Sequence, residues 1–251
     1  MNFDDVTAIQ IPEGNVKSIA IGGVTVWEAP VVDKYTWDAV FASIDAGTYA
    51  ADYAIGDTVP LNLGSEGIIN MQIAAFDADD LADGSGKAPI TWIVKELLVT
   101  THRMNPERAA NGDGTYQEGT GAIGGWEKTE MRTYLKETIK PLIPENVRSA
   151  IKEVTKTHDA YNTAGTKFTQ TSIEDVWVPD YNEVFDSSSP YKAMFPDAAS
   201  RKKYKVGATS ASSWWLSSAY SYGTFYYVTS AGYNNSENAY KSYGVALGFC
   251  T

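Results

Sequence analysis

Apolar residues recur along the chain at two spacings, and the first of these predicts helices. One stretch with the helical period stops at Gly47, because glycine is a poor helix former. A second stretch reaches Pro141, which we expect to end its helix. Pro144 and Asp180 are suited to begin helices, the first by its fixed φ angle and the second as a cap. The predicted helices are residues 35–53, 126–139, 145–150 and 181–185.

The second spacing, an alternation or a short continuous apolar run, predicts strands. Residues 16–21 and 24–27 are two such runs around Gly22 and Gly23, which is a β-hairpin signal. Residues 101–123 are rich in Gly, Asn and Asp, which predicts a long surface loop. The other predicted strands are 58–63, 68–76, 90–99, 151–157, 176–179, 214–217, 224–229 and 244–249. Helices mixed with strands, followed by strands alone, favour the α+β class.

The same pattern divides the chain into a short leader and one main domain. Residues 1–30 contain the predicted hairpin and end at a connector formed by Ala29 and Pro30. An isolated hairpin is marginally stable in water, so we expect it to pack on the main domain or on a partner chain. Residues 34–251 have a length that one domain accommodates.

The charge of the chain narrows the choice of partners. It carries 31 Asp and Glu against 20 Lys and Arg, a formal net charge of -11. Such a chain repels nucleic acid and anionic membranes, so we expect neither as a partner. It contains no apolar run of the ~20 residues that span a bilayer. The first residues lack the basic and apolar regions of a signal peptide, which predicts synthesis in the cytoplasm without membrane insertion.

The sequence offers little for catalysis or for metal binding. His102 and His158 are the only histidines, and no Gly-x-Ser-x-Gly motif accompanies the many serines. The single cysteine, Cys250, excludes an internal disulfide, and we expect a buried, inert thiol there. The acidic loop 77–83 has the oxygen ligands that calcium prefers, but Gly84 comes too late for an EF-hand. We therefore expect solvated acidic turns, no enzyme, no metal and no cofactor.

The segment 214–251 has the most informative composition. It contains 7 of the 16 tyrosines, and Tyr, Ser, Asn and Gly make up 20 of its 38 residues. Only Glu237 and Lys241 are charged within it. Antibody binding loops have this composition, because tyrosine gives contact area at low entropic cost and Ser, Gly and Asn supply adaptable hydrogen bonds. The alternative is a β-segment with surface tyrosines, which explains the strands better than the tyrosine-bearing turns.

The two ends of this segment carry a family resemblance. Residues 214–218, Trp-Trp-Leu-Ser-Ser, and residues 244–250, Gly-Val-Ala-Leu-Gly-Phe-Cys, resemble the frame of variable regions in target proteins of diversity-generating retroelements. Those proteins belong to phages and bacteria and have a C-type-lectin fold. The upstream part resembles a domain of unknown function of gut bacteria and their phages, through residues 36–37, 53–57, 76–80, 90–93, 124–135 and 176–179. The resemblance covers about residues 34–251 and implies a C-type-lectin-like domain behind the hairpin.

The resemblance also implies which positions vary. In such systems adenines are copied with errors, and an Asn codon then yields Tyr, Ser, Thr, Ala, Asp, Gly or Phe, but not Glu or Lys. Glu237 and Lys241 therefore fall outside the variation. Ten residues are compatible with it and form the expected ligand-binding set: Tyr220, Ser221, Tyr222, Tyr226, Tyr227, Tyr233, Asn234, Ser236, Tyr240 and Tyr243. The expected fixed frame is Trp214, Trp215, Gly244, Gly248, Phe249 and Cys250.

The implied function is a phage- or prophage-encoded receptor-binding display protein. Its variable surface is expected to bind a bacterial surface protein or glycan, either from the virion tail or after synthesis in the host cytoplasm. The resemblance to a C-type-lectin fold does not by itself imply sugar binding, because residues 177–180 lack the acid-amide motif of calcium-dependent lectins. Two alternatives stay open: a structural virion subunit whose tyrosines contact other subunits, and a cell-surface hydrolase using Asp or Glu.

Overall fold

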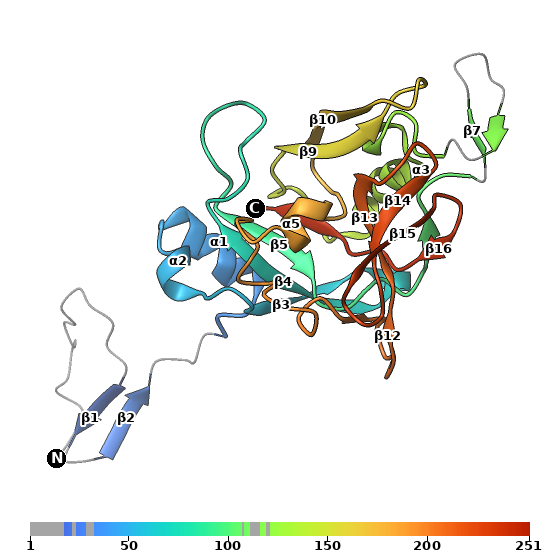
Figure 1. The fold of residues 1–251 in the computed structure, drawn as a ribbon. Coiled ribbons are helices and arrows are strands. Elements are labelled where there is room, and N and C mark those ends of the chain that lie inside the picture. Colours follow the sequence, from blue (N-terminus) through green and yellow to red (C-terminus); the bar gives the residue numbers. More distant parts are fainter. Residues whose placement is uncertain (1–17, 22–23, 29–32, 107, 111–115, 119–120) are drawn as a thin grey trace. The chain divides into compact units, whose positions relative to one another are not determined.

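The computed structural model describes residues 18–21, 24–28, 33–106, 108–110, 116–118 and 121–251, and it divides into two units (Figure 1). The first unit, Met1–Lys34, contains strands β1 (Ser18–Ile21) and β2 (Val24–Glu28), which pair antiparallel with an irregular register at Ile19 and Ala20. The predicted glycine turn at 22–23 and the connector at 29–30 lie outside the described residues.

The second unit, Tyr35–Thr251, has the mixed composition that the sequence predicts. About 20% of the chain is helix and 35% is strand, in several small antiparallel sheets, so the chain is α+β. The unit opens with helices α1 (Trp37–Asp45) and α2 (Tyr49–Asp52). None of the helices in the described part of the chain is long and apolar enough to cross a membrane.

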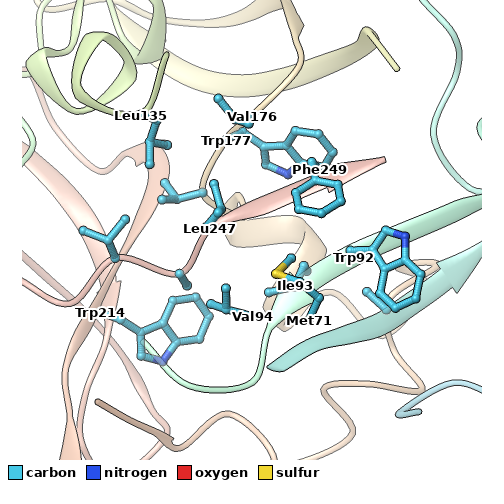
Figure 2. Close-up of a cluster of buried hydrophobic side chains, with 14 of the residues drawn as sticks. Met71, Trp92, Ile93, Val94, Leu135, Val176, Trp177, Trp214, Leu247 and Phe249 are labelled. Atoms are coloured by element: carbon cyan, nitrogen blue, oxygen red, sulfur yellow. The ribbon is translucent and has the colours of Figure 1, made fainter. Parts of the chain in front are cut away.

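A four-stranded antiparallel sheet lies at the centre of this unit. Its order is β17 (Gly248–Cys250), β5 (Ile90–Val94), β4 (Ile68–Phe76) and β3 (Thr58–Asn62). Every residue of β5 is buried, so other elements cover both of its faces. The last strand joins the sheet beside β5, with Phe249 opposite Trp92. Figure 2 shows these two side chains in the core with Trp177, Trp214 and Leu135.

The C-terminal segment forms a second, three-stranded antiparallel sheet. Its order is β13 (Trp214–Ala219), β14 (Thr224–Val228) and β15 (Asn234–Asn238). A short strand after it, β16 (Ser242–Tyr243), pairs with β6 (His102–Arg103). The two ends of the segment thus join different sheets, and the tyrosine-rich part lies between them.

Strands β6 to β10 revise the expectations for residues 101–123 and 151–157. Strand β6 and the pair β7 (Arg108–Ala110) and β8 (Tyr116–Glu118) replace a continuous surface loop, and β6 is held by pairing with the distant β16. The strand expected at 151–157 is β9 (Val154–Tyr161). It pairs along its length with β10 (Lys167–Glu174), whose mostly exposed, polar residues gave no apolar period to detect.

The helical region after residue 125 is less regular than its period indicates. It consists of η3 (Trp126–Lys128), α3 (Glu130–Tyr134), the π-helix η4 (Leu135–Ile139) and the 3-10 turn η5 (Lys140–Leu142). The α- and π-helical part ends at Ile139, before Pro141 as expected, and a single 3-10 turn with Pro141 near its start follows it. Short helices α4 (Glu145–Arg148) and α5 (Tyr181–Phe185) follow where Pro144 and Asp180 predict them.

Two further expectations do not hold. Residues 176–179 form no strand but a buried segment, in which Trp177 makes a single bridge with Gly248. Residues 189–203, whose sequence predicts loop and helix with a basic end at 201–203, form turns without a helix. They end in β11 (Lys203–Tyr204), which pairs with β12 (Ala211–Ser212). An apolar run such as 176–179 thus predicts that the segment is buried, but it does not determine the backbone conformation. The same holds for the basic end of 189–203.

Candidate ligand-binding surface

The predicted ligand-binding set and the predicted frame differ in burial. Trp214, Trp215, Gly244, Gly248, Phe249 and Cys250 are all buried. None of the ten predicted binding residues is buried. The exposed tyrosines among them are Tyr220 (51%), Tyr222 (51%), Tyr233 (63%) and Tyr240 (36%), and Asn234 is exposed as well. Packed side chains therefore hold the segment in place, while the tyrosine, serine and asparagine side chains between them reach solvent.

Strand register places the predicted residues on two faces of the β13–β14–β15 sheet. Successive residues of a strand point to opposite faces, so Tyr226 and Tyr227 lie on different ones. Tyr226 is opposite Ser236 of β15. Tyr227 is opposite Asn235 of β15 and Trp215 of β13. One sheet therefore brings the predicted residues together, but it does not place them on one continuous face.

The first face, which we name the Tyr226 face, carries a cluster of tyrosine rings. The ring centroid of Tyr226 is 4.4 Å from that of Tyr181 and 5.1 Å from that of Tyr220. Asn234 donates a hydrogen bond to the Tyr181 hydroxyl at 3.4 Å. The Tyr161 hydroxyl donates to the Tyr220 carbonyl at 2.7 Å. Tilted and edge-to-face ring pairs of this kind hold the aromatic side chains in fixed orientations.

An ion pair lies near this cluster. Lys167 Nζ is 2.8 Å from Asp159 Oδ2, and this hydrogen bond raises the pKa of Lys167. The pKa of Tyr226 is also raised, first by burial and next by the neighbouring Tyr181. The Tyr226 hydroxyl therefore stays protonated at neutral pH. The face offers a ligand aromatic rings, neutral hydroxyl groups and a compensated ion pair.

The opposite face, which we name the Tyr227 face, carries a second aromatic cluster. Trp215, Tyr227 and Tyr243 have ring centroids 4.6–6.0 Å apart. Trp215 Nε1 donates to the carbonyl oxygen of His102 at 3.0 Å, which fixes the cluster to β6. Burial, Tyr227 and Glu237 together raise the pKa of Tyr243 to about 12. Glu237, which falls outside the expected variation, thus lies close enough to influence the electrostatics of this face.

The remaining predicted residues lie in turns or at strand ends. The Ser221 hydroxyl is 2.8 Å from that of Thr224 in the turn between β13 and β14, where Tyr222 also lies. The backbone N–H of Tyr233 donates to the Thr229 hydroxyl at 3.1 Å in the turn before β15. Tyr240 follows β15. These local hydrogen bonds shape the turns and leave the tyrosine side chains exposed.

Helix α5 positions Tyr181 through a buried network. Asp180 and Glu183 form a capping box, with Asp180 accepting from the Glu183 N–H at 2.6 Å and Glu183 accepting from the Asp180 N–H at 2.8 Å. Lys156 then donates to Glu183 at 2.5 Å and to Asp79 at 2.6 Å. A buried ion-pair network of this kind tolerates little displacement, so it fixes the helix against the core.

This network accounts for one residue of the acidic loop considered for calcium. Asp79 is buried and accepts hydrogen bonds from Lys156, Tyr191 and Thr91. The exposed Asp80 pairs with Lys87 at 2.8 Å. Among the residues that the structure describes, no group of three or more His, Cys, Asp or Glu is arranged to hold a metal ion. The protein's own donors therefore occupy the carboxylates of Asp79 and Asp80.

The buried histidine and cysteine are poorly placed for chemistry. His158 lies between the hydroxyls of Ser217 (2.8 Å) and Ser172 (3.2 Å), and burial lowers its pKa to about 3. Burial raises the pKa of Cys250 well above its usual range, and its Sγ is 3.4 Å from Asp79. A neutral imidazole and a protonated thiol, both inside the core, do not form an activated nucleophile.

Sequence reasoning missed three aromatic residues of the Tyr226 face. Tyr161 ends β9, and Tyr181 and Phe185 belong to α5, with rings 5.1 Å apart. They lie outside the tyrosine-rich segment, so composition gave no reason to join them to it. Only the tertiary packing of α5 and β9 beside β13 and β14 places them next to Tyr220 and Tyr226.

Comparison with known proteins identifies the family. Residues 94–250 match the family model described as a domain of unknown function (DUF6273). Since the match covers more than half of the chain, the chain belongs to this family. The matched region begins in β5 and extends to β17, so it includes both aromatic faces. No curated protein and no solved structure matches the chain.

Proposed function

We propose that this member of the DUF6273 family is a ligand-binding display protein with a C-type-lectin-like domain, encoded by a phage or prophage. The observation that carries the proposal is the separation described above. All ten residues of the expected variable set reach solvent, while the residues that flank them are buried in the core. A surface that is changed by mutation needs this arrangement, because changes at exposed positions usually cost within about ±0.5 kcal/mol.

The chemistry of the exposed residues supports recognition rather than catalysis. Tyrosine presents a large, stiff, amphipathic side chain, and Ser and Asn add adaptable hydrogen bonds. The tyrosines on the Tyr226 face hold one another in place, so little freedom is lost on binding. The proposed ligand is a protein or glycan of a bacterial cell surface, bound by the display protein on a virion tail. The resemblance to retroelement target proteins supports the same assignment.

The test measures binding of the fluorescently labelled protein to a panel of intact bacterial strains by flow cytometry. The exposed-tyrosine variant carries Tyr220→Ala, Tyr222→Ala, Tyr233→Ala and Tyr240→Ala. We expect it to bind the recognised strains at least about tenfold less, because aromatic anchors dominate binding energy. Its melting temperature should stay close to that of the native protein, because all four side chains are exposed.

A matched control removes equally exposed apolar side chains elsewhere. Ile68→Ala, Val99→Ala and Tyr204→Ala truncate residues that are 63%, 45% and 41% exposed and lie outside the segment 214–251. The control variant should bind cells as the native protein does. The proposal is wrong if the exposed-tyrosine variant binds normally, if both variants lose binding equally, or if no strain is bound.

One observation favours a second function, that of a structural virion subunit. The two aromatic clusters lie on opposite faces of one sheet, so they are suited to contact two neighbouring subunits. Sedimentation of the purified protein separates the two functions. A display protein that uses these faces for a ligand keeps them free in solution, whereas a subunit self-associates through them. Tyr226→Ala or Tyr227→Ala would then dissociate the assembly.

A further inference from the structure

A depression on the surface is lined by cationic side chains, far in sequence from the tyrosine-rich segment. Its volume is about 430 Å³, and its lining consists of Lys136, Lys140, Pro141, Glu145, Arg148 and Ser149. The volume falls in the range of small-molecule sites. Three of the six lining residues are cationic, in a protein whose net charge is -11. Such a local concentration of positive charge in an acidic chain calls for an explanation.

The backbone explains how the lysines reach the same depression. Lys136 lies in the π-helix η4 and Lys140 is the first residue of η5, and residues four apart in a helical segment share one side of it. Single π-turns within α-helices occur often at functional sites. The chain then turns at Pro141 and Pro144, and α4 brings Arg148 to the depression from the other side.

Fixed partners hold these cations in place. Lys140 Nζ is 2.5 Å from Asp175 Oδ2, and Lys136 Nζ is 3.2 Å from Glu174 Oε2. Glu174 is fully buried, and its Oε1 atom also pairs with Nε of Arg132 at 2.8 Å. Arg148 donates to the carbonyl oxygens of Pro141 and Ile143 at 3.0 and 3.4 Å. The cations are therefore positioned before any ligand arrives, which lowers the entropy lost on binding.

Only one of the carboxylates that pair with these cations lines the depression itself. Glu174 and Asp175, which pair with Lys136 and Lys140, do not belong to its lining, whereas Glu145 does. Glu145 lines the depression and pairs with Arg148, but its side chain is 74% exposed. An exposed pair of this kind contributes little to stability, so a stronger anion can replace the Glu145 carboxylate.

The geometry points to a binding site for a small phosphorylated molecule, whose phosphate group is held by Lys136, Lys140 and Arg148. A phosphate carries up to two negative charges and several acceptor oxygens, which suits three converging cations better than a single carboxylate does. Nη2 of Arg148 can exchange the Glu145 carboxylate for the phosphate while Nη1 keeps its contacts with the two carbonyl oxygens. The site shares no residue with the tyrosine-bearing faces, so a failure of this inference would not affect the proposed display function.

The test is titration of the full-length protein with inorganic phosphate by isothermal calorimetry, at constant ionic strength with chloride as the background. We expect saturable binding. Glu145→Gln removes the competing carboxylate and should tighten the dissociation constant about threefold. Arg148→Gln should weaken it at least about tenfold. The opposite signs of the two effects are the signature of the site.

Two features keep the test decisive if Arg148→Gln folds poorly. Glu145 is mostly exposed, so Glu145→Gln should fold normally. Glu137→Gln makes the same charge change on η4, next to Lys136 in sequence but outside the lining of the depression, and should leave the dissociation constant unchanged. The inference is overturned if phosphate gives no saturable binding. It is equally overturned if Glu145→Gln weakens binding, or if both glutamate variants change the dissociation constant alike.

Discussion

At the scale of single residues, two fully buried lysines differ because their neighbours differ. For Lys156, burial alone lowers the pKa, but the carboxylates of Glu183 and Asp79 outweigh it and raise the pKa overall. Lys203 donates to the carbonyl oxygen of Val94 and has no carboxylate in contact among the described residues, so burial lowers its pKa to about 7. The first lysine belongs to an ion-pair network, whereas the second is a source of instability.

Replacement of Lys203 tests this difference. The folded-state pKa of Lys203 lies below its ordinary value of 10.5, so the charged form is disfavoured in the folded protein. Lys203→Met should therefore raise the free energy of unfolding at pH 7 by about 1–3 kcal/mol. The gain should shrink as pH rises towards 10.5, because the lysine of the unfolded chain then also loses its proton. Urea unfolding of both proteins at several pH values measures this gain in the free energy of unfolding. A variant that is less stable than the native protein at pH 7 would contradict the prediction.

His158 gives the protein a predictable acid sensitivity. Burial lowers its folded-state pKa to about 3 from 6.5, so its contribution to stability is present above pH 6.5 and is lost as pH falls towards 3. Between pH 6.5 and 5 the loss should be about 2 kcal/mol. His158→Gln should lower the free energy of unfolding at neutral pH. The variant protein should also take up about one proton fewer than the native protein when it unfolds in acid. Equal pH slopes for the two proteins would show that His158 does not titrate as described.

At the scale of elements, sequence periodicity located most strands but not their partners. The runs 58–63 and 68–76 correspond to β3 and β4, since both alternate and pack one side on the core. β10 and β15 escaped detection because their residues are polar and largely exposed. Such strands are specified by the neighbour with which they pair rather than by their own apolar residues.

The turn between β14 and β15 depends on Gly232. This residue has a φ angle of +88°, and an added Cβ atom would lie 1.8 Å from the Ala198 carbonyl oxygen. Gly232→Ala should lower the free energy of unfolding by about 3 kcal/mol or more, through strain and overlap together. Gly84→Ala is the matched control, with φ +74° and open space around it, and should cost about 1 kcal/mol. Similar losses in both variants would mean that the overlap with Ala198 is relieved easily.

The two faces of the β13–β14–β15 sheet should contribute unequally to binding. A rigid ligand on one face cannot reach the other, so only one of Tyr226→Ala and Tyr227→Ala should weaken cell binding at least about tenfold. Flow cytometry on a strain bound by the native protein distinguishes them. Comparable losses for both variants, with unchanged melting temperatures, would mean that the ligand contacts both faces or wraps around the sheet edge.

At the scale of the whole molecule, the sequence predicted the α+β class and the composition of the candidate surface, but not its shape. Composition singled out the segment 214–251, and the resemblance to retroelement target proteins selected ten residues within it, each of which reaches solvent. Neither provided a means to divide them between two faces, because that division follows from the pairing of β14 with β13 and β15. Nor did either join Tyr181 and Tyr161 to the surface, because those contacts span about 40 to 60 residues of chain.

The most direct test of a diversified binding surface is the pattern of natural change in the gene. Reads covering codons 214–251 from many cells of one population give the fraction of amino-acid substitutions that fall on the ten positions of the expected ligand-binding set. We predict that these positions take nearly all substitutions, while the codons for Trp214, Trp215 and Gly248 stay constant. Substitutions spread evenly over the segment, or silent changes alone, would contradict the account.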